Sequence, residues 1–271
     1  MSETAPQTII FSDIDGTLLN SEHKITPLTQ QAIRDVEANG IPFAIVTARG
    51  ITGTYPVLEQ HGIDCAVVCY SGGVILNERR EVIHHQGLSK AEAQEIVDFC
   101  EVEGFDMSWS AYSFEDWVSP DVSDPRIKNE ERIVMAQSRE GDIASIERDE
   151  VQKILCFCNP ACTDEIERRL HERFPQHSIA QSSDILIEVM RGGTSKANAV
   201  RTLCDLMGVD PAAAIAFGDN YNDVPMLEVV GRGYLMMNAP APLLEQIPLH
   251  APADNDHDGI YLALKDLGFV A

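Results

Sequence analysis

Hydrophobic positions in the first and last thirds of the chain follow two alternating patterns. Continuously apolar runs such as TIIF (8–11), FAIV (43–46) and CAVV (65–68) are separated by segments whose apolar residues recur every three or four positions. The continuous runs are typical of strands buried on both faces of a parallel sheet, and the spaced segments of amphipathic helices. The pattern therefore predicts an α/β fold.

The segment 25–40, ITPLTQQAIRDVEANG, has the capping residues and the apolar stripe of a helix. Thr26 suits the N-cap and Pro27 the first turn, and Gly40 ends the segment. The expected stripe consists of Leu28, Ala32, Ile33 and Val36. The following segments predict a strand over 41–49, a helix over 51–62 and a strand over 63–73.

The pattern changes near residue 74, where VILNERREVIHH alternates around a polar turn and predicts a hairpin. Beyond it the sequence predicts a helix capped by Ser89, strands over 105–118, 151–158 and 184–190, a polar loop over 119–131, and a helix over 164–174. The α/β rhythm resumes with a helix over 194–208, a strand over 212–218, a helix beginning near Asn222, a strand around 233–237 and a helix within 258–268.

This change of rhythm predicts two domains. We expect residues 1–81 and 191–271 to form one domain around a Rossmann-like parallel sheet. Residues 82–190 are then an inserted α+β domain. A length of 271 residues and an apolar fraction of 44% are sufficient for two moderate cores.

Polar side chains follow three of the predicted core strands. Asp13 and Asp15 follow the first strand, Thr47 the second, and Asp219 and Asp223 the strand at 212–218. Ligands of open parallel sheets bind beyond the carboxyl ends of the strands, so we expect these side chains to converge there. Any single one is more commonly a turn former or a helix cap. Four aspartates together favour a functional site.

Four converging carboxylates raise one another's pKa unless positive charge lies among them. Mg²⁺, which binds a few carboxylates together with water and phosphate, supplies that charge. Asp13 and Asp15 are two residues apart, so both point the same way in extended backbone, and Gly16 then allows a sharp turn. The pattern indicates a magnesium site.

Lys196 and Thr47 are candidates for binding an anion. Lys196 lies in the first turn of a predicted helix, where the helix dipole disfavours a cation but attracts an anion. The Thr47 hydroxyl and the N–H groups after it have the chemistry to hold a phosphate oxygen. The alternatives are a solvated surface lysine and a capping threonine.

Composition narrows the partners and the compartment. A net charge of −23 argues against nucleic acid or an anionic membrane as the main partner. The sequence has no apolar run near the ~20 residues that span a bilayer, and its start, MSETAPQTII, lacks the basic residues of a signal peptide. Seven cysteines lie mostly in apolar runs, as expected of thiols in the cytoplasm. Cys156, Cys158 and Cys162 lack the paired spacing of a zinc site.

Four motifs in order resemble those of haloacid-dehalogenase-like (HAD) phosphatases. They are DIDGTLL (13–19), VTAR (46–49), the helix-borne Lys196 and GDNYNDVPML (218–227). The long α+β insert between the second and third motifs and the tail DNDHDGI (254–260) resemble the Cof-type subgroup, in which a large cap covers the active site. The resemblance extends over nearly the whole chain.

The resemblance implies a cytoplasmic, magnesium-dependent phosphomonoesterase that acts on a small metabolite such as a sugar phosphate. Asp13 is implied as the nucleophile that becomes an aspartyl phosphate, and Asp15 as the acid and then the base. Mg²⁺ is implied to bind Asp13, Asp219 and the backbone carbonyl of Asp15, with Asp223 orienting the metal shell.

The resemblance also implies residues that hold the phosphoryl group and the substrate: Thr47, Ala48, Ser71, Lys196 and Asn222. Two of them depart from the common pattern and bear on substrate choice. Ser71 stands where many relatives have asparagine, and Ala48 stands where glycine is frequent.

Other functions remain open at this point. A phosphomutase would use the same core, although the large cap argues against it. A non-catalytic protein that binds a phosphorylated metabolite would need neither Asp13 nor Asp15, and both are present. Trp109, Tyr112 and Trp117 of the insert are candidates for a lid over the substrate, and the alternative is that they form the insert's own core.

Overall fold

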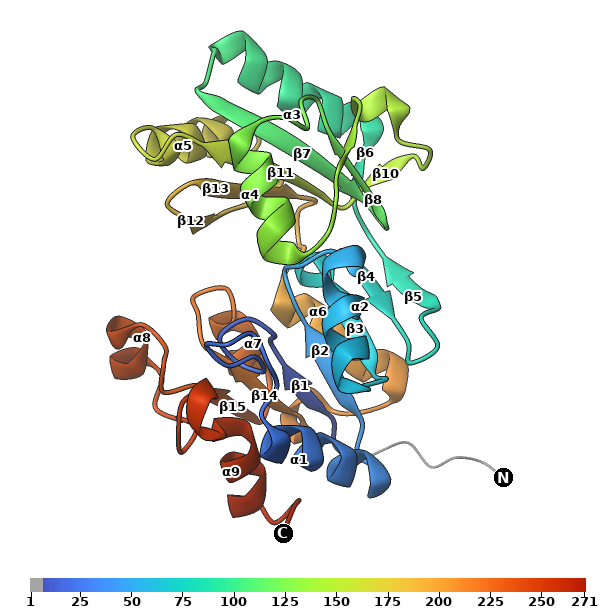
Figure 1. Cartoon of the computed structure of the whole chain (residues 1–271), viewed down its shortest axis with the longest axis vertical. Coiled ribbons are helices and arrows are strands. Elements are labelled where there is room, and N and C mark those ends of the chain that lie inside the picture. Colours follow the sequence, from blue (N-terminus) through green and yellow to red (C-terminus); the bar gives the residue numbers. More distant parts are fainter. Residues whose placement is uncertain (1–6) are drawn as a thin grey trace. The chain divides into compact units, whose positions relative to one another are not determined.

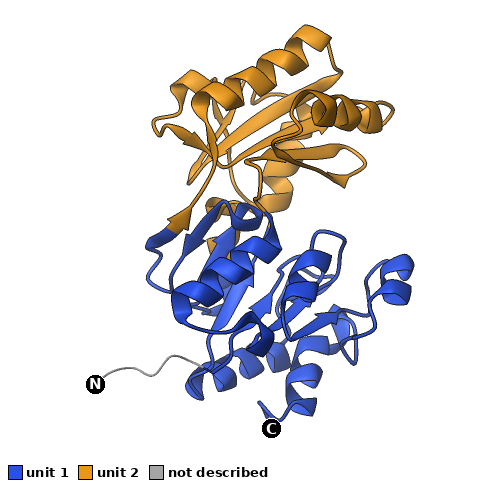
Figure 2. Ribbon diagram, turned by 180° about the vertical axis from the view of Figure 1, so that it is seen from behind, with its two compact units in different colours: residues 1–47, 58–83, 195–271 blue, residues 48–57, 84–194 orange. Residues whose placement is uncertain are grey.

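The computed structural model describes residues 7–271 and divides the chain into two compact units (Figures 1 and 2). Unit 1 contains the residues up to 47, 58–83 and 195–271, and unit 2 contains residues 48–57 and 84–194. Residues 1–6, to which the signal-peptide argument partly refers, lie outside the described residues. The limits of the two functional domains stay a prediction. The structural division differs from them in assigning residues 48–57 and 191–194 to unit 2 and residues 82–83 to unit 1.

Unit 1 is built on a seven-stranded sheet with the order β15-β14-β1-β2-β3-β4-β5 (Figure 1). Its strands are β1 (Ile10–Ser12), β2 (Phe43–Val46), β3 (Ala66–Cys69), β4 (Val74–Leu76), β5 (Val82–His85), β14 (Ile215–Gly218) and β15 (Arg232–Leu235). The strands from β15 to β3 pair in parallel, and β4 pairs antiparallel with β3. The predicted α/β fold and the hairpin that begins at residue 74 are confirmed.

The strands of unit 1 are apolar because both faces of the sheet are buried. Ile9 and Phe11 pack with Val200 and Leu203 in one hydrophobic cluster, while Ile10, between them, is also completely buried. Successive strand residues point to opposite faces, so the run TIIF needs an apolar side chain on each side. The continuous apolar pattern has this physical cause.

The helices that contain residues of unit 1 are α1 (Pro27–Ala38), α2 (Ile51–His61), α6 (Lys196–Met207), α7 (Val224–Val229), α8 (Ala241–Gln246) and α9 (Gly259–Asp266). As predicted, the Thr26 side chain caps α1 and Pro27 is its first residue. The expected stripe is wrong at Leu28, which is 47% exposed. The buried positions are Thr29, Ala32, Ile33 and Val36, and they complete a regular helical face with Thr29 in place of Leu28. The sequence prediction missed α8.

Unit 2 is an α+β unit around a six-stranded sheet with the order β12-β13-β11-β7-β8-β9 (Figure 1). Its strands are β7 (Met107–Ser113), β8 (Asp116–Ser119), β9 (Arg139–Glu140), β11 (Lys153–Cys158), β12 (Ser178–Ser183) and β13 (Leu186–Met190), with a separate pair of β6 (Leu88–Ser89) and β10 (Glu150–Val151). All neighbours in the main sheet are antiparallel except β8 and β9. The sequence prediction missed β12.

The core of unit 2 lies between one sheet face and two helices, α3 (Lys90–Glu103) and α5 (Thr163–Arg173). Ile96 of α3 and Leu170 of α5 pack in one cluster with Trp109 and Ile154. Trp109 is therefore part of the unit's own core. Ser89 caps α3 through a full capping box, as its sequence predicts.

The polar loop predicted over 119–131 is wrong, because Pro125–Val134 form helix α4. The Asp124 side chain accepts a hydrogen bond from the Arg126 N–H, and Pro125 is the first helical residue. Only Ile127 supplies a completely buried apolar side chain, so the helix has little apolar signal in the sequence. Among the described residues, no helix is long and apolar enough to cross a bilayer.

The burial of Ile127 can be tested against an isoleucine of the same helix. Ile127 is completely buried, whereas Ile133 is 48% exposed. Ile127→Ala should lower the free energy of unfolding by about 2–5 kcal/mol, because it removes buried methyl groups and leaves a cavity. Ile133→Ala should change it by less than about 0.5 kcal/mol.

Tryptophan fluorescence during urea denaturation measures this difference. Both tryptophans of the chain, Trp109 and Trp117, lie in unit 2 strands, so the signal follows the unfolding of that unit. Equal denaturation midpoints for the two variants would contradict the assignment of Ile127 to the packed face of α4.

Candidate active site

The site of unit 1 is assembled at the carboxyl ends of neighbouring parallel strands. Asp13 follows β1, Thr47 follows β2 and Asp219 follows β14. The Asp13 N–H donates to the Phe217 carbonyl at 3.0 Å, which ties the end of β1 to β14. Because β14, β1 and β2 are adjacent and parallel, their ends fall at one edge of the sheet.

Lys196 lies at the centre of the site. It is the first residue of α6, whose N-cap is Ser195, and it is only 2% exposed. Its Nζ donates to Asp13 Oδ1 at 2.7 Å and to Asp223 Oδ1 at 2.6 Å. The surface-lysine alternative is therefore excluded, because the ammonium is buried between two carboxylates.

Asp223 is completely buried, and it holds the loop after β14 as well as the ammonium. Its Oδ2 accepts hydrogen bonds from the N–H groups of Asp219 and Asn220, both at 3.0 Å. A Cβ on Gly218 would lie 2.4 Å from the Asp223 Cβ, so only glycine allows the carboxylate to fold back on this loop. One carboxylate thus fixes both the position of Asp219 and one side of Lys196.

Burial disfavours the ionised form of the Asp13 and Asp219 carboxylates in this site and so raises their pKa. Burial raises the pKa of Asp13 to about 8, against the opposing effect of Lys196 and with a further contribution from Asp223. Burial also raises the pKa of Asp219 to about 6. Burial alone would lower the pKa of Lys196, but the carboxylates of Asp13 and Asp223 outweigh it and raise that pKa. The ammonium is charged, and it does not balance all the carboxylates.

Asp13, Asp219 and Asp223 form a group suited to a hard cation. One carboxylate oxygen from each lies within 4.8 Å of the others. Carboxylate oxygens are the ligands that Mg²⁺ prefers, and one lysine against three carboxylates leaves a negative excess that a divalent cation would neutralise. The donor set and its charge therefore fit a bound Mg²⁺.

Asp15 and Asn222 are exposed, unlike the buried cluster. Asp15 follows Asp13 by two residues, and its carboxylate lies outside the group of three close carboxylates. Asn222 immediately precedes the buried Asp223. Their exposure leaves both side chains accessible to a ligand or to water.

Thr47 and Ser71 are joined through the backbone. The Ser71 N–H donates to the Thr47 carbonyl at 2.9 Å, and the Thr47 N–H donates to the Val68 carbonyl at 2.9 Å. Ser71 has φ 53°, in the left-handed region, within the short turn Tyr70–Gly72. A Cβ on Gly72 would lie 3.1 Å from the Ser195 carbonyl, so this turn packs directly against the start of α6. The turn, Thr47 and the helix bearing Lys196 are thereby adjacent.

Ala48, the remaining residue of the predicted set, belongs to unit 2. Its carbonyl accepts a hydrogen bond from Lys153 Nζ at 3.0 Å. No local pattern connects residue 48 with Lys153, because the contact joins positions 105 residues apart.

Several residues that support the site were not predicted. The Thr17 hydroxyl donates to Asp219 Oδ1 at 2.8 Å, and Asn238 Nδ2 donates to the Gly16 carbonyl at 2.7 Å. Asn255 Nδ2 donates to the Leu19 carbonyl at 2.8 Å. Thr17 lies within DIDGTLL and Asn255 within DNDHDGI, so the motifs themselves were the available signal.

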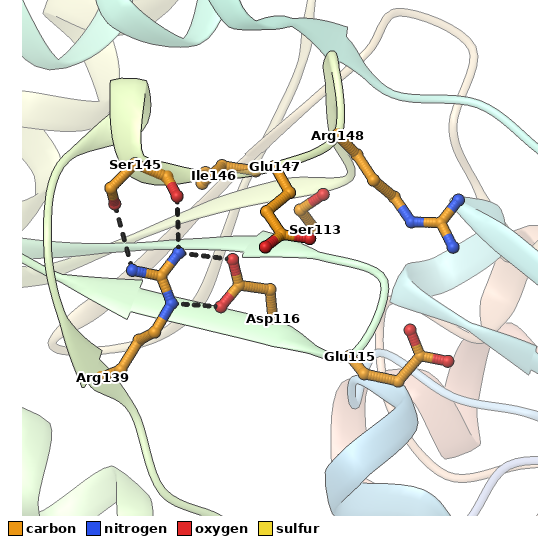
Figure 3. A pocket seen from close by; sticks show the side chains of 8 residues that line it. All are labelled: Ser113, Glu115, Asp116, Arg139, Ser145, Ile146, Glu147 and Arg148. Carbon is orange, nitrogen blue, oxygen red and sulfur yellow. Dashed lines mark hydrogen bonds and ion pairs between the residues drawn. The ribbon is translucent and has the colours of Figure 1, made fainter.

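A separate cavity of about 610 Å³ lies in unit 2, and none of the predicted site residues lines it. Figure 3 shows that Arg139, one of its two arginines, is held by Asp116 and Ser145. The Arg139 Nε and Nη2 donate to the two Asp116 carboxylate oxygens, each at 2.7 Å. This bidentate pair orders the cavity wall, so the arginine is already engaged with its own unit.

Comparison with known proteins identifies the family. The family model for haloacid dehalogenase-like hydrolases matches residues 10–264. A Haemophilus influenzae protein provisionally named a phosphatase is 35% identical over 257 residues, which cover 95% of this chain and 97% of that protein. HMP-PP phosphatase from Cronobacter sakazakii is 27% identical and matches 89% of this chain and 87% of its own length.

Solved structures agree on the fold. A haloacid dehalogenase-like hydrolase from Bacteroides thetaiotaomicron has a TM-score of 0.86 at 23% identity, covering 97% of this chain and 100% of its own. A HAD subclass IIB sugar phosphatase has a TM-score of 0.83 at 22% identity, covering 97% of this chain and 100% of its own.

The chain belongs to the haloacid dehalogenase-like hydrolases, and within them to the Cof-type subgroup with an α+β cap. The predicted membership of this family is confirmed. It is an enzyme of the phosphatase type.

The closeness of Gly16 to Asp219 gives a test of the carboxylate group. A Cβ on Gly16, which has φ +78°, would lie 2.4 Å from Asp219 Oδ2. Gly16→Ala should therefore displace Asp219 and weaken Mg²⁺ binding by roughly 10- to 100-fold, the usual effect of disturbing a ligand's support. Isothermal titration calorimetry with Mg²⁺ measures the change.

Gly40→Ala is the matched control. Gly40 has φ +75° but nothing within 4 Å of its added Cβ. Both variants place a Cβ in the left-handed region, at about 1–2 kcal/mol each. Only Gly16→Ala should also lose metal affinity, and equal Mg²⁺ affinities in the two variants would contradict the site.

Proposed function

We propose that this enzyme hydrolyses the phosphate monoester of a small metabolite, of the sugar phosphate kind, with Mg²⁺ and through an aspartyl phosphate on Asp13. The observation that carries the proposal is the buried cluster of Asp13, Lys196, Asp219 and Asp223 at the ends of the parallel strands. It combines a carboxylate, a fixed positive charge and room for a hard cation, which a phosphoryl group requires.

Asp13 is the proposed nucleophile. One of its carboxylate oxygens forms a bond to phosphorus while the bond from phosphorus to the leaving oxygen breaks. Lys196 Nζ, 2.7 Å from Asp13 Oδ1, favours the ionised carboxylate, which is the form that attacks. Burial restricts the Asp13 side chain and keeps it oriented by that contact.

Asp15 is the proposed acid and base. It gives its proton to the leaving oxygen in the first step, so that the alcohol departs neutral. In the second step it takes a proton from the water that attacks the aspartyl phosphate, which releases inorganic phosphate and restores Asp13. Its exposure supports this role, because the group must meet both the leaving group and water.

The remaining residues of the site hold the phosphoryl group in this proposal. Lys196 supplies charge, and Thr47 with the N–H of Ala48 supplies hydrogen bonds to phosphoryl oxygens. Ser71 and Asn222 contact the substrate near the same group. Thr47 and Ser71 are already joined by a hydrogen bond, which supports a shared role.

Mg²⁺ is proposed to bind the carboxylates of Asp13 and Asp219 and the backbone carbonyl of Asp15. Asp223 orients this group, since it fixes both Lys196 and the loop that bears Asp219. When bound, the ion neutralises charge on the phosphoryl oxygens and on the attacking carboxylate. The surplus of carboxylates over ammonium groups supports this assignment.

The inserted domain, residues 82–190 of the predicted division, is proposed to set specificity for the leaving group. The site residues account for the phosphoryl group alone, so recognition of the remainder must come from other residues. Charge and composition support the cytoplasm as the compartment and a small phosphate ester as the partner, in preference to nucleic acid or a membrane.

Asp13→Asn tests the nucleophile. An amide cannot attack phosphorus as a carboxylate does, so turnover should fall to background while the fold is retained. Phosphate release is measured over a panel of sugar phosphates and other small esters together with HMP-PP, the compound in the name of one relative. Asp64→Asn, an exposed aspartate of unit 1, is the control and should keep full activity.

The outcomes separate the alternatives. Near-normal phosphate release by folded Asp13→Asn would refute the aspartyl phosphate. Transfer of phosphate to a second hydroxyl of the substrate, without release, would identify a phosphomutase. Binding of phosphate esters without any turnover by the unmodified enzyme would identify a non-catalytic binding protein.

Removal of the metal tests the carboxylate cluster independently. Exhaustive chelation should abolish hydrolysis, and added Mg²⁺ should restore it. Ca²⁺ should restore little activity, because its larger and more flexible coordination shell misplaces the nucleophile relative to phosphorus. Phosphate release after dialysis against chelator is the measurement, and full activity without any divalent ion would rule out the proposed site.

A further inference from the structure

Unit 2 contains a buried ion pair between Lys153 and Glu188, and its lysine contacts Ala48, the residue after Thr47. Lys153 of β11 is 5% exposed, and its Nζ lies 3.1 Å from Glu188 Oε1 of β13. The same Nζ donates to the Ala48 carbonyl at 3.0 Å. All three residues belong to unit 2.

The Lys153 ammonium is held on two sides by its own sheet. Lys153 lies opposite Tyr112 in the register of β11 and β7, with its Nζ 5.3 Å from the centre of the Tyr112 ring. Tyr112 in turn stacks on Trp117, with ring centres 5.1 Å apart. Together with Glu188, this arrangement restricts the ammonium and directs it to the Ala48 carbonyl.

Stability alone does not account for this pair. Burying an ammonium and a carboxylate removes both from water, and well-packed apolar residues in such positions are often as stable. The ammonium and the Glu188 carboxylate balance each other's charge, and the same Nζ also donates to a backbone carbonyl. The contact of the buried Lys153 ammonium with the Ala48 carbonyl indicates that Lys153 fixes the backbone conformation of this turn.

The carbonyl in question controls the backbone next to the proposed phosphate site. Because the C=O and the following N–H of a trans peptide point in opposite directions, holding the Ala48 carbonyl sets the direction of the Arg49 N–H. Thr47, one residue earlier, is fixed by hydrogen bonds to Val68 and Ser71. Two consecutive residues are thus held, the first by the parallel sheet and the second by Lys153.

We infer that Lys153 is a positioning residue for the turn at residues 47–49, and that Glu188 holds it in place. The inference rests on the proposed function, since it assigns the turn to the transferring phosphoryl group. Lys153 acts on that group through the backbone and not on the leaving group. Its loss should therefore affect every substrate alike, although it lies in the unit that is proposed to set specificity.

The test replaces Lys153 with an apolar residue of similar length. Lys153→Met should lower kcat/KM for all esters of the panel by a common factor of roughly 10- to 100-fold, the size expected for a small misplacement of a binding group. The inhibition constant of inorganic phosphate, which has no leaving group, should rise in the same variant. Lys153→Arg keeps the positive charge and N–H donors at this position. It should therefore restore part of kcat/KM and part of the inhibition by phosphate.

Lys90→Met is the matched control. Lys90 also lies in unit 2, and its Nζ donates to two backbone carbonyls, those of Ala144 at 3.1 Å and Ile146 at 2.6 Å. These carbonyls are far in sequence from Thr47. Lys90→Met should leave the inhibition by phosphate and the ranking of substrates unchanged.

Glu188→Gln covers the case in which Lys153→Met fails to fold, as judged by the fluorescence of Trp109 and Trp117. It keeps an acceptor near Lys153 but removes the charge that holds the ammonium, so it should weaken inhibition by phosphate in the same direction. Unchanged inhibition in folded Lys153→Met or Glu188→Gln would overturn the inference. A reordered ranking of substrates would overturn it as well, because that result marks contact with the leaving group.

Failure of this inference is distinguishable from failure of the proposed function. If the unmodified enzyme releases no phosphate from any ester, the proposed function fails. If it does release phosphate and Lys153→Met behaves like Lys90→Met, only the positioning role fails.

Discussion

The buried ammonium of Lys196 is the interaction on which the site depends. It joins Asp13 and Asp223, which lie 183 and 27 residues away in the sequence, and it is the reason that their carboxylates can lie close together in a buried place. Without a cation between them, the mutual repulsion and the desolvation of the carboxylates would protonate one or displace both. The raised pKa of Asp13 shows that one ammonium offsets this cost only in part.

The surrounding structure keeps these groups in place by bracing loops rather than by adding charge. The loop between β1 and α1 is held at its Gly16 carbonyl by Asn238 and at its Leu19 carbonyl by Asn255. The Thr26 hydroxyl at the end of this loop donates to Asp258 at 2.5 Å. The tail motif DNDHDGI therefore stabilises the loop that carries Asp15, and this contact gives a physical reason for its presence near the end of the chain.

The fold was predictable where one physical signal dominated a segment. Continuous apolar runs indicated the parallel strands, and Thr26 and Ser89 marked helix starts through caps that the structure contains. Helix α4 was not predictable from periodicity, because its apolar burial rests on Ile127 alone. Leu28 was misassigned because two overlapping helical stripes are possible, and packing selects the one that contains Thr29.

The sequence indicated which residues lie near the candidate site, but not which partners they contact. Strand ends indicated which aspartates could converge, and the strand order β14-β1-β2 of the structure brings them to one edge. The roles of these residues stay a prediction. The partners of Thr17, Asn238 and Ala48 depend on contacts between distant segments, and no local pattern in the sequence carries that information.

Lys196 and Lys153 are both buried, but their ammonium groups have different surroundings. Lys196 has two carboxylate partners and a third carboxylate nearby, so its surroundings keep a negative excess that a divalent cation can neutralise. The Glu188 carboxylate matches the charge of Lys153, and the same Nζ also donates to the Ala48 carbonyl. In the proposed roles, the charge of Lys196 takes part in the chemistry of the phosphoryl group, whereas the charge of Lys153 holds a peptide in one direction. The lysine ammonium suits both positions because it is a compact point charge with three hydrogen-bond donors.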